Sequence, residues 1–119
     1  MNNLPLFIKL QRQNCLVVGG GVVAARKINQ LLVAEAKVFV VAPELHDEIK
    51  EFSKSGEINH INQDYTEECM EGKQLVIAAT NNGKLNAKIA EHAKSKNILV
   101  NVVDNPDARS EERRVGKEC

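Results

Sequence analysis

The sequence predicts an α/β domain in which helices cover both faces of a parallel β-sheet. Short apolar runs typical of strands alternate with segments whose apolar residues have helical spacing. The run at residues 74–79 is typical of a central parallel strand that is buried on both faces. With 119 residues, of which 43% are hydrophobic, the chain can bury one core. We therefore expect one domain over residues 1–107, with right-handed crossovers between its strands.

The first half of the chain is expected to contain most of these elements. Pro43 suits the first turn of a helix, and Gly56 is a natural stop after it. The elements are, in order, a strand or extended lead-in at 6–10, a strand at 15–18, a helix at 22–34, a strand at 37–41, a helix from 43 or 44 to 55, and a weak strand at 58–62. The first helix should bury one side, made of Val22, Ala25, Ile28, Leu31 and Leu32.

The second half adds two strands and one helix. After the strand at 74–79, Asn81 and Asn82 supply a cap for a helix whose apolar residues recur every four positions, at Leu85, Ile89 and Ala93. The last strand is expected at 98–103. The sheet should therefore stop after its fifth main strand.

A glycine cluster between the strand at 15–18 and the first helix is the most informative motif. Gly19, Gly21 and Ala24 match the G-x-G-x-x-G/A pattern of a dinucleotide-binding turn in a Rossmann-like sheet. Gly19 would allow a sharp turn, Gly21 would let a pyrophosphate approach the backbone, and Ala24 would keep the helix close to the strand. The helix N-terminus would then face the phosphates. The alternative is a glycine turn that only packs a helix on a sheet.

The ribose of such a cofactor should lie near the end of the second strand. Pro43 and Glu44 follow that strand, and Glu44 could reach the ribose or serve as an acid in the first turn of the next helix. No arginine near these residues would hold a 2′-phosphate, so NAD is expected rather than NADP.

Two further candidates follow strands at the edge where such sheets bind ligands. Thr80 could hydrogen-bond the cofactor or could start the following helix. Asp104 directly follows the last strand and precedes Pro106. A carboxylate held there could be a general base, or it could form an Asx-turn that starts a loop.

Composition argues against several other classes of protein. Sixteen basic residues balance sixteen acidic ones, so neither nucleic acid nor an anionic membrane is an expected partner. The N-terminus lacks a signal-peptide pattern, and no apolar run is long enough to cross a bilayer. The three cysteines lack the spacing of a disulfide framework or zinc site, which favours reduced thiols in the cytoplasm. His46, His60 and His92 match no metal motif, so no metal is expected.

The last residues of the chain differ from the rest. From residue 108 to 119, seven of twelve residues are charged and apolar residues show no periodicity. We expect this tail to be disordered and foreign to the native protein.

Four segments together resemble the N-terminal domain of siroheme synthases, the precorrin-2 dehydrogenase family. They are Leu4-Pro5-Leu6-Phe7, residues 15–27, Ala78-Ala79-Thr80-Asn81 and Asn101-Val102-Val103-Asp104. The resemblance extends over about residues 3 to 106, with the segments in the family's order and at matching distances.

This resemblance implies NAD-dependent oxidation of the tetrapyrrole precorrin-2 to sirohydrochlorin, and some members also insert ferrous iron. It implies pyrophosphate contacts at Gly19, Gly20, Gly21, Val22 and Val23. It places the ribose beside Pro43 and Glu44, and it makes Asp104 the general base.

Family members continue into a dimerisation segment and a helical region, where this chain has its charged tail. A homodimer is therefore expected of the full-length family member but is in doubt for this chain. The many carboxylates of the substrate need basic partners, for which Lys9, Arg12 and Arg26 are candidates; the alternative for each is a solvated surface charge.

Two other functions remain open at this point. The chain could be a regulatory module that senses NAD without chemistry, or a Rossmann-like structural domain without a ligand. The Asn-Val-Val-Asp-Asn-Pro setting of Asp104 favours the enzyme over the sensing module, and a measurement of NAD binding separates both from the structural domain.

Overall fold

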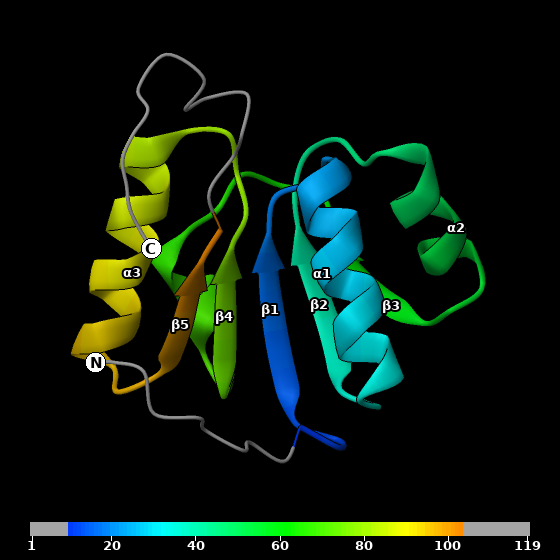
Figure 1. Cartoon of the computed structure of the whole chain (residues 1–119). Coiled ribbons are helices and arrows are strands. Elements are labelled where there is room, and N and C mark those ends of the chain that lie inside the picture. Colours follow the sequence, from blue (N-terminus) through cyan, green and yellow to red (C-terminus); the bar gives the residue numbers. More distant parts are fainter. Residues whose placement is uncertain (1–9, 104–119) are drawn as a thin grey trace.

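The computed structural model describes residues 10–103, which form one five-stranded sheet with its helices (Figure 1). The predicted charged tail, the limits of the domain and most of the lead-in at 6–10 lie outside these residues. The elements are, in order, β1 (Asn14–Val18), α1 (Val22–Val33), β2 (Lys37–Val41), α2 (Asp47–Lys54), β3 (Ile58–Ile61), the 3₁₀ helix η1 (Glu67–Met70), β4 (Leu75–Ala78), α3 (Gly83–Ser95) and β5 (Leu99–Val102).

All five strands are parallel and lie in the order β3-β2-β1-β4-β5. The chain runs outward from β1 to β3, then crosses back to place β4 on the other side of β1 (Figure 1). The strand order therefore reverses between β1 and β4, where an open α/β sheet binds its ligand. This arrangement confirms the predicted Rossmann-like fold class.

Helices cover both faces of the sheet because successive strand residues point to opposite sides. Cys15 and Val17 of β1 pack into the core beneath α1 and α2. Leu16 and Val18 pack into a second core, beneath α3 and η1. Each β1 side chain is therefore buried on one face or the other, which explains the continuous apolar run.

The buried face of α1 differs from the predicted one at its first residue. Val22 is 53% exposed, whereas Ala24 is fully buried against the sheet. The alanine lets the helix lie close to β1, as the motif predicts, and the same rotation turns Val22 outward. Of the other predicted residues, Ala25, Ile28 and Leu31 are buried, and Leu32 is half-buried.

The second helix begins later than the predicted start at residue 43 or 44. α2 starts at Asp47, because the His46 side chain caps it by accepting the backbone N–H of Glu48 at 3.2 Å. The His46 N–H also donates to the carbonyl of Gly20 at 2.6 Å, which ties this loop to the glycine turn. The predicted stop is confirmed, since Gly56 follows the end of α2 with φ of +82°.

Candidate functional site

The three glycines after β1 have three different roles. Gly19 has φ of +128°, and a Cβ there would lie 2.5 Å from the Ala79 carbonyl oxygen. A Cβ on Gly20 would overlap the Glu44 carbonyl oxygen. A Cβ on Gly21 would meet no heavy atom within 4 Å. The fold therefore requires glycine at the first two positions, whereas Gly21 leaves open space that the fold itself does not use.

This difference predicts that alanine destabilises the protein at Gly20 but not at Gly21. Gly20→Ala should lower the free energy of unfolding by about 1–3 kcal/mol, because its methyl group displaces the loop after β2. Gly21→Ala is the matched control and should change stability little, since the site is open and its backbone is extended. Urea unfolding of the two variants checks this. Equal losses of stability in the two variants would show that the close contact between Gly20 and the Glu44 carbonyl is not what requires glycine there.

The N-terminus of α1 lacks a side-chain cap, unlike those of α2 and α3. Gly21 is its N-cap residue and its first turn has no acidic side chain. His46 caps α2 and Asn82 caps α3. The first amides of α1, including those of Val22 and Val23, form the positive end of the helix dipole. No side-chain cap accepts a hydrogen bond from them. Such an end suits an anionic ligand.

An open cleft of about 810 Å³ lies at the carboxyl ends of the strands, on either side of this helix N-terminus. Its lining includes every cofactor-binding residue predicted from the sequence, namely Gly19, Gly20, Gly21, Val22, Val23, Pro43, Glu44 and Thr80. The fold thus brings together residues from the turns after β1, β2 and β4.

Glu44 lines the cleft from a loop, not from a helix. The alternative role as an acid in the first turn of α2 is wrong, because that turn holds Asp47 and Glu48. The loop adopts this path because His46 bonds the Gly20 carbonyl. The Glu44 side chain therefore has no capping task that competes with a ligand.

Thr80 has the role of starting the next helix. Its hydroxyl donates to Asn86 Oδ1 at 2.6 Å and accepts the Asn82 N–H at 3.1 Å. The Asn86 side chain also bonds both main-chain groups of Thr80, at 3.2 and 3.0 Å. Thr80 therefore lines the cleft from a turn fixed by these hydrogen bonds, and its hydroxyl is already bonded to Asn86 and Asn82.

Asn86 is a residue that the sequence analysis misses. It is only 6% exposed and belongs to the buried side of α3, with Ile89 and Ala93. A polar residue on an otherwise apolar helical face is the signal that could have identified it, because a buried amide needs partners.

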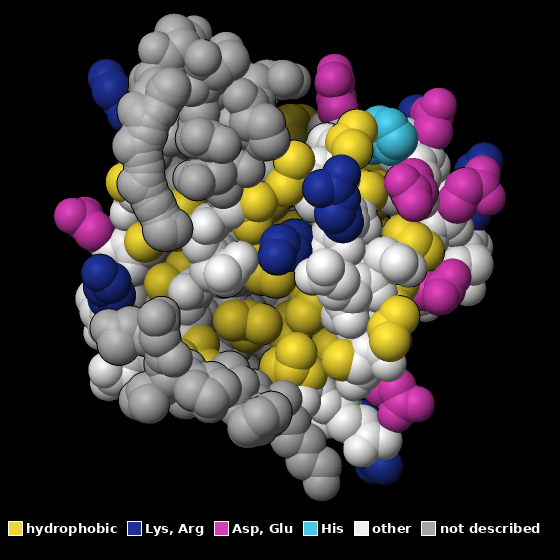
Figure 2. Space-filling view, in the orientation of Figure 1, with side chains coloured by type: hydrophobic (Ala, Val, Ile, Leu, Met, Phe, Trp, Pro, Cys, Tyr) yellow, Lys and Arg dark blue, Asp and Glu magenta, His cyan; other side chains and the backbone are white. Residues whose placement is uncertain are grey.

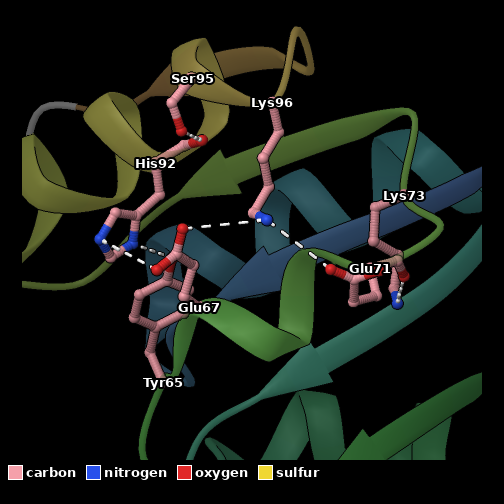
Figure 3. A network of polar contacts seen from close by, with 7 residues as sticks. All are labelled: Tyr65, Glu67, Glu71, Lys73, His92, Ser95 and Lys96. Carbon is pink, nitrogen blue, oxygen red and sulfur yellow. Dashed lines mark hydrogen bonds and ion pairs between the residues drawn. The ribbon is translucent and has the colours of Figure 1, made fainter.

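Tyr65 and Asp64 also line the cleft and were not predicted. The Tyr65 hydroxyl lies 2.7 Å from His92 Nδ1 on α3, and the other ring nitrogen of His92 faces Glu67 at 3.9 Å (Figure 3). Lys96 pairs with Glu67 at 3.8 Å in the same network. Burial, with smaller effects from Glu67 and Cys69, raises the pKa of Tyr65 from 10.0 to about 12.

The raised pKa predicts loss of stability in alkali. Between pH 10 and about 12 the Tyr65 hydroxyl ionises in the unfolded chain but stays neutral in the folded one, so the free energy of unfolding should fall as pH rises through this range. The chain has one tyrosine, so its phenolate absorbance reports this residue alone. Ionisation near pH 10 in the folded protein would contradict the packing of the hydroxyl.

Asp104 lies outside the described residues, so the structure places only the chain that leads to it. The N–H of Val103 donates to the Ala78 carbonyl at 2.9 Å, beside the end of β4. The chain therefore reaches residue 103 at the edge of the sheet that carries the cleft.

Among the described residues, the cleft lining includes neither Arg12 nor Arg26, two of the basic candidates for binding substrate carboxylates. Arg12 precedes β1 and lies at the opposite end of that strand, while Arg26 lies on the exposed face of α1. Figure 2 shows Lys and Arg side chains over α1 and acidic ones toward α2. Lys9 lies outside the described residues.

Residues 10–103 present neither a metal-binding cluster nor a membrane-spanning helix. This part of the chain has no cluster of three or more His, Cys, Asp or Glu side chains able to hold a metal ion. His60 instead bonds the Ala42 carbonyl at 2.8 Å. No helix in the same range is both long and apolar enough to cross a membrane.

Known proteins resemble this chain over nearly all of its length. Siroheme synthases from Chromobacterium violaceum and Psychromonas ingrahamii are 44% and 46% identical over 108 and 110 residues. These matches cover 91% and 92% of this chain but 23% of each relative. They confirm the resemblance predicted from the motifs.

A solved structure, SirC, precorrin-2 dehydrogenase, has the same fold. It superposes with a TM-score of 0.72 and 29% identity, over 83% of this chain and 48% of that one. The family model described as "Putative NAD(P)-binding" matches residues 6–110. Because this match includes the glycine turn and all five strands, the chain belongs to this NAD(P)-binding family.

Proposed function

We propose that the cleft binds NAD and that the chain is the dinucleotide-binding part of an enzyme that oxidises precorrin-2 to sirohydrochlorin. The observation that carries the proposal is the uncapped N-terminus of α1 beside Gly21, whose missing side chain leaves open space at the point where strand order reverses. The siroheme synthase relatives and the precorrin-2 dehydrogenase structure support the reaction.

The residues of the cleft fit such a cofactor. The amides at the start of α1 would hold the pyrophosphate, and Gly21 would let it approach the backbone. Glu44 would accept hydrogen bonds from the ribose hydroxyls, which favours NAD over NADP because a carboxylate repels a 2′-phosphate. When bound, NAD supplies the hydride acceptor. The residues of this chain would hold NAD in one orientation in the cleft.

We propose Asp104 as the general base that takes the proton when the substrate loses a hydride. It directly follows Val103, whose N–H bonds the Ala78 carbonyl at the carboxyl end of the sheet, and ligands of such sheets bind at that end. The whole enzyme is expected to be cytoplasmic and a homodimer, as the resemblance and the cysteine usage imply. Residues 108–119 are proposed to take no part in the domain.

The test uses two steps, because the chain spans 23% of the length of the relatives. Calorimetry first measures NAD and NADP binding to the chain, with tighter NAD binding expected. The chain is then joined after Pro106 to the remainder of the Chromobacterium violaceum siroheme synthase and assayed for NAD-dependent sirohydrochlorin formation. NAD binding without turnover in this fusion would favour a sensing module, and no binding would overturn the proposal.

A further inference from the structure

Tyr65 lies between the cleft and α3. It follows β3 in the chain, lines the cleft together with Leu85, and packs against the apolar core beneath α3. In the described part of the chain, three residues with ring side chains line the cleft: Pro43, His46 and Tyr65. Pro43 is not aromatic, and His46 is an exposed imidazole that caps α2 through Nδ1. Tyr65 is therefore the larger aromatic side chain of the lining and the one that is packed against the core.

The tyrosine ring is held in place before any ligand binds. Its hydroxyl is bonded to His92 Nδ1 at 2.7 Å, and the two rings are nearly parallel, at 25° (Figure 3). Glu67 faces the other side of His92 and is paired with Lys96. The hydroxyl is neutral at physiological pH, so Tyr65 is not a general base there. A fixed, neutral ring loses little entropy when a flat group packs on it.

We propose that Tyr65 is a ligand-contacting residue, against which one flat ring of the bound dinucleotide packs, and that His92 is its positioning residue. This inference depends on the proposed function, since it assumes that the cleft binds a dinucleotide. Either the adenine or the nicotinamide ring has the chemistry to pack on a phenol face.

The test compares NAD affinities by calorimetry. Tyr65→Leu should weaken binding about 5- to 10-fold, because it removes the aromatic contact. Phe39→Leu is the matched control. Phe39 is a half-buried aromatic residue of β2 whose ring lies under Lys73, away from the cleft lining. The control should leave the affinity unchanged.

The role of His92 is tested by a double-mutant cycle. Tyr65→Phe and His92→Phe remove the same hydrogen bond, so each should weaken NAD binding about 2- to 5-fold and the double variant no further. Additive effects would show that His92 does not act through Tyr65. A loss of stability alone would not produce this coupling in affinity.

A second measurement needs no substitution and covers the case in which Tyr65→Leu does not fold. Fluorotyrosine incorporation gives one ¹⁹F resonance, because Tyr65 is the single tyrosine. NAD should shift it. A shift with ADP-ribose as well assigns the contact to adenine, and a shift with NAD alone assigns it to nicotinamide. NAD binding with no shift and unchanged Tyr65→Leu affinity would overturn this inference alone, whereas no NAD binding would overturn the proposed function with it.

Discussion

Gly21→Asp should abolish NAD binding without unfolding the protein. A Cβ at this position would meet no heavy atom within 4 Å, and the backbone is extended, so we expect the fold to accept the substitution. Aspartate is also a favourable N-cap residue, so α1 should be as stable as before or more so. Its carboxylate would, however, stand where the pyrophosphate is proposed to lie. Like charges in such contact cost several kcal/mol, which weakens binding by about 100-fold or more.

Calorimetric titration of NAD and thermal unfolding of the same samples measure both effects. Gly21→Ala is the control, since it adds a small neutral group at the same place and should weaken binding less. Retained affinity in Gly21→Asp would remove the glycine turn from the account. A loss of affinity together with a loss of folding would show that Gly21 has a structural role after all.

Asp104→Asn should cut sirohydrochlorin formation by about 10²-fold or more, because asparagine keeps the shape but cannot accept a proton. NAD affinity should stay nearly unchanged, since the pyrophosphate and ribose contacts are proposed to come from the turns after β1 and β2. The assay uses the fusion described above, in which the missing part of the relatives' length is supplied.

The matched control for Asp104→Asn is Asn101→Asp, which changes an exposed residue of β5 in the same segment. It should leave turnover within a few-fold of the parent. If the Asp104→Asn fusion turns over normally, Asp104 is a turn residue and the proton acceptor is elsewhere.

The strands could be predicted because burial on both faces of the sheet requires a continuous run of apolar residues, which is visible in the sequence. The sequence predicts β2 at residues 37–41, as observed, and places β1 within one residue of its start. The glycine turn predicts the Rossmann-like fold class, which the observed strand order confirms. The buried side of α1 is predicted well except at Val22, where the close approach of Ala24 to the sheet sets the rotation of the helix.

The parts that were missed depend on contacts between distant segments. The start of α2 shifts to Asp47 because His46 bonds the Gly20 carbonyl, a contact that spacing along the chain does not reveal. The sequence predicts two alternative roles for Thr80, and its contacts with Asn86, one turn into α3, distinguish them. Tyr65 lies in the loop between β3 and η1, where no helical or strand periodicity marks it. Each needs tertiary structure to be found.

The location of NAD on the folded chain is the most direct test of the central claim. In an amide NMR titration, the largest shifts should be those of Gly20, Gly21, Val22 and Val23, with smaller shifts in the loop after β2. Gln13, Gln74 and Asn97, which line a separate hollow at the opposite end of the strands, should not move. Shifts centred on that hollow, or none at saturating NAD, would contradict the assignment of the cleft as the NAD site.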